Sequence, residues 1–464
     1  MLQFSRVALL ALLCAGAAQA ATWNDPFSTE QGITDSRLIG NRTSACLKIR
    51  TSGPFSLSDI VERTLCNNPQ TASAWAAARA QAAQLGIAKS AYLPTASATV
   101  SGSRARSSSD LVTGHGYTNS SDTSLGLNYL LYDFGARAAS LENAKQLLIA
   151  ANAARDTTLQ TLFLTAVQDY YALFSAQESV KAYRQSEESA AQSLAVAQGK
   201  LIAGVSTKAD VLQAQTALSQ ATYNRIKAEG DVQNARGQLA VLMALSPTTP
   251  LAVTPPRSIT FDARTGTDLE KLIQEAQSNR PDLVAANAQV RAAQAAIDLA
   301  NAQGKPTINL GMATDWAYSE VNQHSHNSSI GVTLSVPIFT GYKSTYSVRA
   351  AEAQLDARKA ERDNTANQIA LDVWKAYQNL LTNNAAMKTA DDLVASAEQS
   401  ESVARGRYKA GVGTFADLLA AQSALATARQ NRVTSLYNLY TSKFSLAQAM
   451  GQLDFGLIDN GSAQ

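Results

Sequence analysis

The sequence predicts an α+β membrane protein built from two tandem copies of one helix–strand–strand–helix–helix unit. Three observations predict this class. A very long helical run carries a heptad pattern of apolar residues. Short segments elsewhere alternate apolar and polar residues, which is typical of strands. The same order of motifs occurs twice along the chain, which indicates a duplication rather than a short-period solenoid.

The longest element is expected to run from Gly341 to about Lys409, followed by the turn 411–414 and a second helix over 415–450. A helix of this length would extend roughly 100 Å at ~1.5 Å per residue. This is several times the ~30 Å apolar thickness of a bilayer, so the helix cannot be merely a membrane span. Its narrow stripe must pack on other helices. The stripe comprises Ile369, Val373, Ala376, Leu380, Met387, Ala390, Val394 and Ala397, with Asn383 in one slot.

The first residues have the features of an export signal. Arg6 precedes an apolar run over 7–15, and Ala18-Gln19-Ala20 is a small-residue cleavage site. The mature chain would then begin near Ala21. Cys14 leaves open the alternative of a lipoprotein, although the residue before a lipidated cysteine should be small and here it is Leu13.

Two cysteines, Cys46 and Cys66, remain after cleavage in a chain that has left the reducing cytoplasm. We therefore expect them to form one disulfide. The alternative is two unpaired buried thiols.

Composition and motifs exclude several classes of function. The net charge is +2, so nothing indicates nucleic acid as a partner. No stretch after the signal has eighteen consecutive apolar residues, which excludes helical membrane spans. No nucleophile elbow, phosphate loop or zinc-protease motif occurs, so we expect no enzyme activity and no cofactor.

The histidines His115, His324 and His326 are expected in the loops between paired strands. His324 and His326 could bind a metal, but no cysteine or carboxylate cluster lies near them in the sequence. An exposed loop is therefore the preferred interpretation, and no metal site is predicted.

The repeat is marked by prolines and by the helical turns. Pro69 and Pro94 recur as Pro281 and Pro306 at one common separation, and the turn 204–210 recurs as 411–417. The predicted organisation is a signal peptide at 1–20, an irregular periplasmic arm at 21–56, a first repeat at 57–246, a proline-rich linker at 247–266, a second repeat at 267–451 and a tail at 452–464.

Each copy contains two predicted strands between its helices. The second copy alternates most clearly, over 307–318 and 329–338, and the first alternates over 95–101 and 125–131. Aromatic residues collect at the strand ends. Segments of this kind suit an outer-membrane barrel, because backbone groups in lipid must pair strand to strand. A half-buried soluble sheet remains the alternative.

The number of strands predicts the assembly. Four strands from one chain cannot close a barrel, and eight from a dimer would leave an interior filled by side chains. A homotrimer would form a 12-stranded barrel with a lumen, with four strands per chain. The helices would then continue the tube as a long periplasmic α-helical barrel.

From about Leu57 to Gly451, the chain resembles the TolC family of outer-membrane export ducts. The resemblance is carried by the duplicated element order, by the segment 337–341 that leads into a long helix, and by the turn 408–414. It implies a homotrimer in outer-membrane lipid that docks onto a periplasmic adaptor (membrane fusion) protein and an inner-membrane ABC or proton-driven transporter. The stretch 65–71 also resembles the subgroup that serves cyclolysin-type toxin secretion.

The resemblance further implies a gate at the periplasmic helical tip. Asp417 matches an acidic residue of a ring that closes the entrance, and Asp210 matches an aspartate that accepts a bond from a tyrosine matching Tyr408. The second acid of the family is Ala420 here, and a basic partner near Gly413 is missing, so a looser gate is expected. The alternative, which is compatible with a gate, is that both aspartates cap helices.

The function expected from these features is a passive exit duct in the cell outer membrane, for type I protein or toxin secretion or for multidrug efflux. The alternative is a trimeric coiled-coil surface protein or adhesin. An adhesin places its barrel at one end of the chain, whereas strand pairs interrupt the helices twice here. The sequence leaves the exported cargo open.

Overall fold

The computed structural model describes residues 25–36, 38, 46, 53–109, 112–256, 268–320 and 323–459. The expected signal peptide at 1–20, including Cys14, lies outside the described residues. So do half of the arm at 21–56, residues 257–266 of the linker and residues 460–464 of the tail.

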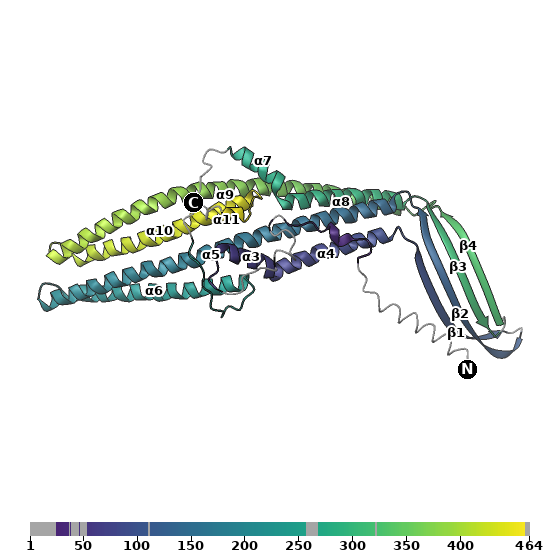
Figure 1. Ribbon diagram of the computed structural model, residues 1–464, viewed down its shortest axis with the longest axis horizontal. Helices are drawn as coiled ribbons and strands as arrows, with labels where there is room; N and C mark the ends of the chain where they lie inside the picture. The colour runs from purple at the N-terminus through teal and green to yellow at the C-terminus, as the bar shows by residue number, and fades with distance from the viewer. Residues whose placement is uncertain are drawn as a thin grey trace. The chain divides into compact units, whose positions relative to one another are not determined.

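The described elements alternate between helices and strand pairs (Figure 1). In chain order they are η1 (Thr29–Gly32), α3 (Leu57–Asn67), α4 (Pro69–Ser90), β1 (Thr95–Ser109), β2 (Val112–Tyr132), α5 (Ala136–Ile202), α6 (Lys208–Leu242), α7 (Leu269–Asn279), α8 (Pro281–Gln303), β3 (Thr307–Ser319), β4 (Gln323–Ser335), α9 (Lys343–Ala410), α10 (Phe415–Ala449) and α11 (Gly456–Asp459).

The tandem repeat is confirmed by this order, since α3 to α6 and α7 to α10 correspond element by element, with one strand pair in each copy. The long helices α5 and α9 have 67 and 68 residues, and α6 and α10 have 35 each. Both copies also enter the long helix through two consecutive residues with positive φ. These are Phe134 and Gly135 before α5, and Gly341 and Tyr342 before α9.

Local sequence signals explain the first helix boundaries. Ser56 caps α3, with its hydroxyl accepting from the Asp59 amide and the Asp59 carboxylate accepting from the Ser56 amide. The break between α3 and α4 occurs at Asn68, because Pro69 disfavours helical geometry in the residue before it. The buried Asn68 side chain donates to the Leu242 carbonyl at the end of α6 at 3.0 Å and accepts from the Gln70 amide in the first turn of α4 at 2.8 Å.

The four strands form one antiparallel sheet in the order β1-β2-β3-β4. The pairing of β2 with β3 joins the two copies in this sheet. Leu127 lies opposite Met312, which in turn lies opposite Ile330, so apolar side chains of adjacent strands share one face. Residues on that face are exposed in the single chain, including Val332 at 64% and Leu334 at 62%.

The strands are longer than the alternating pattern predicts, and the placement of the histidines in loops is wrong. His324 and His326 belong to β4, and His115 belongs to β2. Backbone pairing continues past the apolar segment, because ladder hydrogen bonds do not require apolar side chains. The expected strand at 329–338 ends earlier, at Ser335, shortly before Pro337, which cannot donate a ladder bond.

The chain divides into two compact units, and the division falls within α4, α5, α8 and α9. One unit includes 77–152 and 287–360, which contain the sheet and the adjoining parts of α4, α5, α8 and α9, and the other contains 35–76, 153–286 and 361–464. None of the helices in the described part of the chain has the length and apolar character needed to cross a membrane.

The predicted heptad stripe of α9 is confirmed at five positions, whereas Leu380, Met387 and Val394 are half-buried. Ile369 and Val373 are fully buried, and Ala376, Ala390 and Ala397 are at most 8% exposed. The N-terminal part of the stripe, from Ile369 to Ala376, packs on Leu272 and Met450. Ala397 packs on α10 through Ala428. A long helix poor in large apolar residues is therefore stabilised by close contacts of alanine with neighbouring helices.

Candidate functional site

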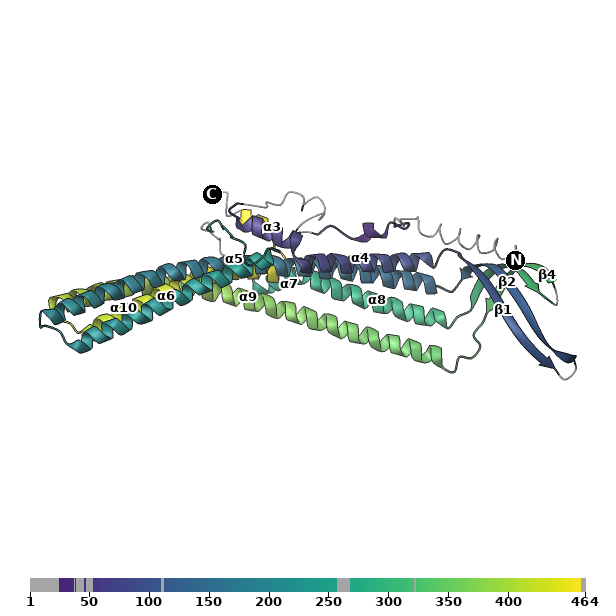
Figure 2. The same ribbon diagram turned by 90° about the horizontal axis from the view of Figure 1, so that it is seen from below.

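The helical turns at 203–207 and 410–414 lie at the same end of the second unit (Figures 1 and 2). In the first turn, the amides of Gly204 and Val205 donate to the carbonyls of Leu201 and Lys200 at 3.0 and 2.9 Å. The second turn repeats both bonds. Gly204 has φ of 72°, a left-handed conformation that glycine adopts at little cost, as does Gly411 at 78°. Glycine at these positions thus lets each helix reverse direction within a few residues.

Each turn ends in a capping box. The Asp210 amide donates to the Thr207 hydroxyl at 3.2 Å, and the Asp210 carboxylate accepts from the Thr207 amide. Asp417 and Thr414 make the equivalent bonds at 3.1 and 3.3 Å. The expected helix caps are thus present in both copies. The bonds to Thr414, and then the nearby charge of Arg407, lower the pKa of Asp417. The side chain of Asp417 is exposed and therefore carries its charge at neutral pH.

Tyr408, at the end of α9, is the buried centre of the tip. It is 4% exposed, and its ring packs edge-on against Phe415 with the centroids 5.4 Å apart. Residues of both hairpins surround it, including Leu194 of α5 and Ala214 of α6. This cluster joins the α5–α6 hairpin to the α9–α10 hairpin.

Lys200 of α5 connects the two hairpins through polar contacts. Its ammonium donates a hydrogen bond to the backbone carbonyl of Tyr408. The same nitrogen lies 4.2 Å from the centroid of the Tyr408 ring, within cation–π range. A positive charge at the carboxyl end of α9 is also favoured by the helix dipole. Nothing local in the sequence predicts this pair, because the two residues are 208 positions apart.

The expected direct bond from Tyr408 to Asp210 is absent from the described residues. The carboxylate of Asp210 instead accepts from the hydroxyl of Ser206 at 2.7 Å. The buried Tyr408 hydroxyl has no partner with hydrogen-bond geometry. Burial raises the pKa of Tyr408, the neighbouring Ser206 hydroxyl opposes the rise, and the Asp210 charge adds to it. Ser206 and Asp210 therefore lie near the Tyr408 phenol. The Asp210 carboxylate, which was expected to accept from this phenol, accepts from Ser206 instead.

A basic partner was expected near Gly413, and Arg407 is the basic residue whose charge acts on Asp417 there. A Cβ atom on Gly413 would lie 3.0 Å from the Arg407 Cβ and 3.3 Å from the Tyr408 amide nitrogen. A side chain there would crowd these atoms, so its neighbours would have to move by a few tenths of an ångström. Ala420, at the place of the second acid, is exposed and carries no charge.

A second polar contact between the hairpins was not predicted. Gln422 of α10 donates to the Ser193 hydroxyl of α5 at 2.9 Å and approaches Glu401 of α9 at 3.4 Å. Glu401 is 5% exposed and is paired with Arg405 one turn further along α9. Only the i, i+4 spacing of Glu401 and Arg405 is visible in the sequence.

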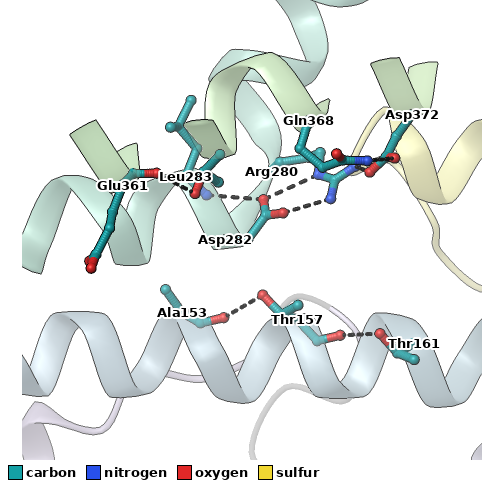
Figure 3. A network of polar contacts seen from close by, with 10 residues as sticks. Ala153, Thr157, Thr161, Arg280, Asp282, Leu283, Glu361, Gln368 and Asp372 are labelled. Atoms are coloured by element: carbon teal, nitrogen blue, oxygen red, sulfur yellow. Dashed lines mark hydrogen bonds and ion pairs between the residues drawn. The ribbon is translucent and has the colours of Figure 1, made fainter. Parts of the chain in front are cut away.

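The breaks between helices are also held by polar groups. Arg280, between α7 and α8, pairs with Asp282 at 2.6 Å and with Asp372 of α9 at 3.1 Å (Figure 3). Gln368 donates to the same Asp372 at 2.7 Å. On α5, the Thr157 hydroxyl donates to the Ala153 carbonyl within the helix. The Arg280 network therefore joins the break between α7 and α8 to the long helix α9.

Cys46 and Cys66 are joined by a disulfide in the structure, with their Cα atoms 5.6 Å apart. Cys66 lies in α3 and is 4% exposed. His326 stacks on the Trp316 ring of β3 with the centroids 5.3 Å apart, and His324 lies tilted against the Tyr318 ring at 5.0 Å. Among the described residues, no group of three or more metal-binding side chains occurs.

Comparisons with known proteins agree with this architecture. The model of the family described as "Outer membrane efflux protein" matches residues 60–245 and 272–452. The chain is 29% identical over 413 residues to Protein CyaE of Bordetella pertussis, covering 87% of this chain and 86% of that protein. It is 25% identical over 434 residues to the outer membrane protein TolC of Vibrio cholerae, covering 90% and 96%.

Solved structures show the same fold. The outer-membrane channel OprN superposes with a TM-score of 0.77 at 21% identity, covering 93% of this chain and 98% of the other. The CmeC outer membrane channel of Campylobacter jejuni gives 0.75 at 20% identity, covering 88% and 89%. The family model matches most of the chain in two segments, one in each copy of the repeat. The chain therefore belongs to the outer membrane efflux protein family.

Proposed function

We propose that this protein is the outer-membrane exit duct of a tripartite export system and that it acts as a homotrimer. The observation that carries the proposal is the four-stranded sheet, in which β1 and β4 each leave one edge without a partner among the described residues (Figure 1). Unpaired backbone groups are very costly in lipid. Pairing β1 of one copy with β4 of the next would satisfy these edges, and three copies give a 12-stranded barrel with a lumen.

The two faces of the sheet support a barrel that contacts lipid on one side. Ile330, Val332 and Leu334 are all more than 60% exposed on one face of β4. Thr333 alternates with them on the opposite face, which would line the lumen. The helices would extend into the periplasm, with the helical turns as the tip.

The tip is proposed as the gate. In a trimer, the Asp417 side chains would place three carboxylates around the entrance, and such a ring favours cations over anions. The Tyr408 cluster and Lys200 would hold the two hairpins of each protomer together in the closed state. Without a second acidic ring at Ala420, this closure depends more on the contacts between hairpins.

The proposed partners are a periplasmic adaptor and an inner-membrane transporter, either ABC-type or proton-driven. The transporter supplies the energy, because the family consists of channel proteins and this chain carries no recognisable catalytic motif. One relative, the probable efflux pump outer membrane protein TtgC of Pseudomonas putida, is 27% identical over 419 residues, and its name points to efflux. The resemblance of the stretch 65–71 to the subgroup that serves cyclolysin-type toxin secretion favours protein secretion.

Recordings of the purified protein in planar bilayers test the duct. We expect large, stable single-channel conductance with cation selectivity. A protein that inserts without conducting would contradict the proposal and favour a surface anchor. Crosslinking in cells, followed by identification of the transporter that co-purifies, would then separate toxin secretion from drug efflux.

A further inference from the structure

Two arginines lie on the apolar face of β1, beyond its apolar residues. Ala98 pairs with Leu125, Arg104 with Asn119 and Arg106 with Tyr117, with no register shift before Ser107. Side chains of a strand alternate strictly between faces while the register is regular. Arg104 and Arg106 therefore point to the same side of the sheet as Ala98. This is the side that the barrel would turn toward lipid.

An aromatic row separates these arginines from the apolar belt. On the same face, Trp316 of β3 is opposite His326 of β4, and Tyr318 is opposite His324. Tyr318 of β3 and Gly102 of β1 pair with the same residue of β2, so they lie at the same height in the sheet. Arg104 is two residues beyond Gly102 and therefore lies further from the apolar belt. Aromatic rows of this kind occupy the boundary between acyl chains and headgroups. The arginines thus reach the depth of the headgroups.

Both guanidinium groups are available to an outside ligand. Arg104 lies 4.5 Å and Arg106 5.8 Å from the centroid of the Tyr117 ring, which holds the two groups near each other. Arg104 and Arg106 are exposed, and Tyr117 is 53% exposed. Within the described part of the chain, neither arginine forms a salt bridge within 4 Å, although the charge of Arg104 acts on the nearby Glu320 carboxylate.

The distribution of acidic residues leaves this face positive. Asp122 and Asp315 of the strands lie on the opposite face, where Asp122 pairs with Ser101. Glu320 is the nearby acid on the arginine side. Both of its carboxylate oxygens are engaged by Asn119, at 3.2 and 2.5 Å. Two positive charges therefore face one carboxylate that is already hydrogen-bonded.

We propose that Arg104, Arg106 and Tyr117 bind the phosphate group of an anionic lipid in the outer leaflet. Guanidinium groups donate paired hydrogen bonds to phosphate oxygens, and each basic residue near an anionic lipid surface adds to binding. A lipid is the occupant because the site continues an apolar face that would contact the acyl chains of the same molecule. The inference rests on the barrel of the proposed function, in which this face is turned toward the membrane.

Native mass spectrometry of the detergent-solubilised protein tests the site. The probes are lipid A with its phosphates, the same lipid after dephosphorylation, and inorganic phosphate as a competitor. We expect bound phosphorylated lipid, and at least about tenfold weaker binding for Arg104→Gln with Arg106→Gln, because two charges are removed. The variant Arg104→Lys with Arg106→Lys should retain intermediate binding, since lysine keeps the charge but not the paired donors.

A charge-matched control moves the arginines to the other face. Adding Ser103→Arg and Ala105→Arg to the double glutamine variant restores the net charge, and we expect it not to restore binding. Equal binding of phosphorylated and dephosphorylated lipid to the unaltered protein would overturn the proposal, as would displacement of the lipid by an equal concentration of inorganic phosphate. Conductance is measured on the same samples, so that failure of the barrel is distinguished from failure of the lipid site.

Discussion

Replacing Lys200 with methionine removes the charged group that links the two hairpins and keeps most of the apolar stem. The substitution abolishes the hydrogen bond from the ammonium to the Tyr408 carbonyl, together with the approach of the nitrogen to 4.2 Å from the ring centroid. A hydrogen bond from a charged group contributes about 1.5 to 3 kcal/mol. The cation–π interaction adds about 0.5 to 1 kcal/mol at an exposed site.

Lys200 is only half buried, so the lower ends of these ranges apply, and we expect the joined state to be destabilised by about 2 kcal/mol per protomer. At about 1.4 kcal/mol per factor of ten, the equilibrium between joined and separated hairpins would shift roughly 30-fold. Planar-bilayer recordings should therefore show a higher open probability for Lys200→Met.

Lys208→Met is the matched control, because Lys208 is exposed in the first turn of α6. It removes the same charge close to the same turn, and we expect near-unaltered gating. Equal effects of the two substitutions would mean that net charge at the tip controls opening. An unchanged open probability in Lys200→Met would refute the role of Lys200 in joining the hairpins.

Three further predictions concern other parts of the chain. Asp417→Ala should lower cation selectivity and remove block by multivalent cations. Because bonds to Thr414 lower the pKa of Asp417, the selectivity of the unaltered channel should persist at neutral pH and fall only when the pH drops below the ordinary range of an aspartate carboxyl. Unchanged selectivity in Asp417→Ala would reduce this aspartate to a helix cap. Cys46→Ser should destabilise the fold by roughly 3 kcal/mol in the chain-entropy model, and this is measured as a lower melting temperature. Free thiols at Cys46 and Cys66 in the exported protein would contradict the disulfide on which this prediction depends. Val332→Arg should impair membrane insertion at a cost of about 2 to 4 kcal/mol near the bilayer midplane. Thr333→Arg should insert normally and alter conductance. Equal loss of membrane insertion in the two variants would contradict the assignment of the lipid-facing and lumen-facing sides.

The sequence predicts the architecture well because its main signals are periodic or duplicated. The stripe residues Ile369, Val373, Ala376, Ala390 and Ala397 are buried as their spacing requires. The capping boxes at Thr207 and Thr414 can also be recognised, since a threonine followed three residues later by an acid is a local signal.

The strand ends and the contacts of the tip could not be predicted in this way. Beyond the lipid belt both faces of a strand can be polar, so the segment that contains His324 shows no alternation although it pairs regularly. The contact of Lys200 with Tyr408 depends on the packing of two hairpins distant in the sequence, and it leaves no local pattern. The expected bond from Tyr408 to Asp210 came from resemblance alone, and in this chain Ser206 donates to that carboxylate.

The most direct test of the trimeric barrel is whether β1 of one copy pairs with β4 of another. Within one chain these strands are separated by β2 and β3, about 14 Å at ~4.8 Å per strand, which is too far for a disulfide. Ala98→Cys combined in turn with Ser328→Cys, Ile330→Cys or Val332→Cys should therefore crosslink only between copies. In native outer membranes under oxidising conditions, we expect at least one pair to give a ladder of covalent species ending at a trimer. A ladder that ends at a dimer or extends beyond three copies, or a chain that remains monomeric with every pair, would contradict the 12-stranded barrel.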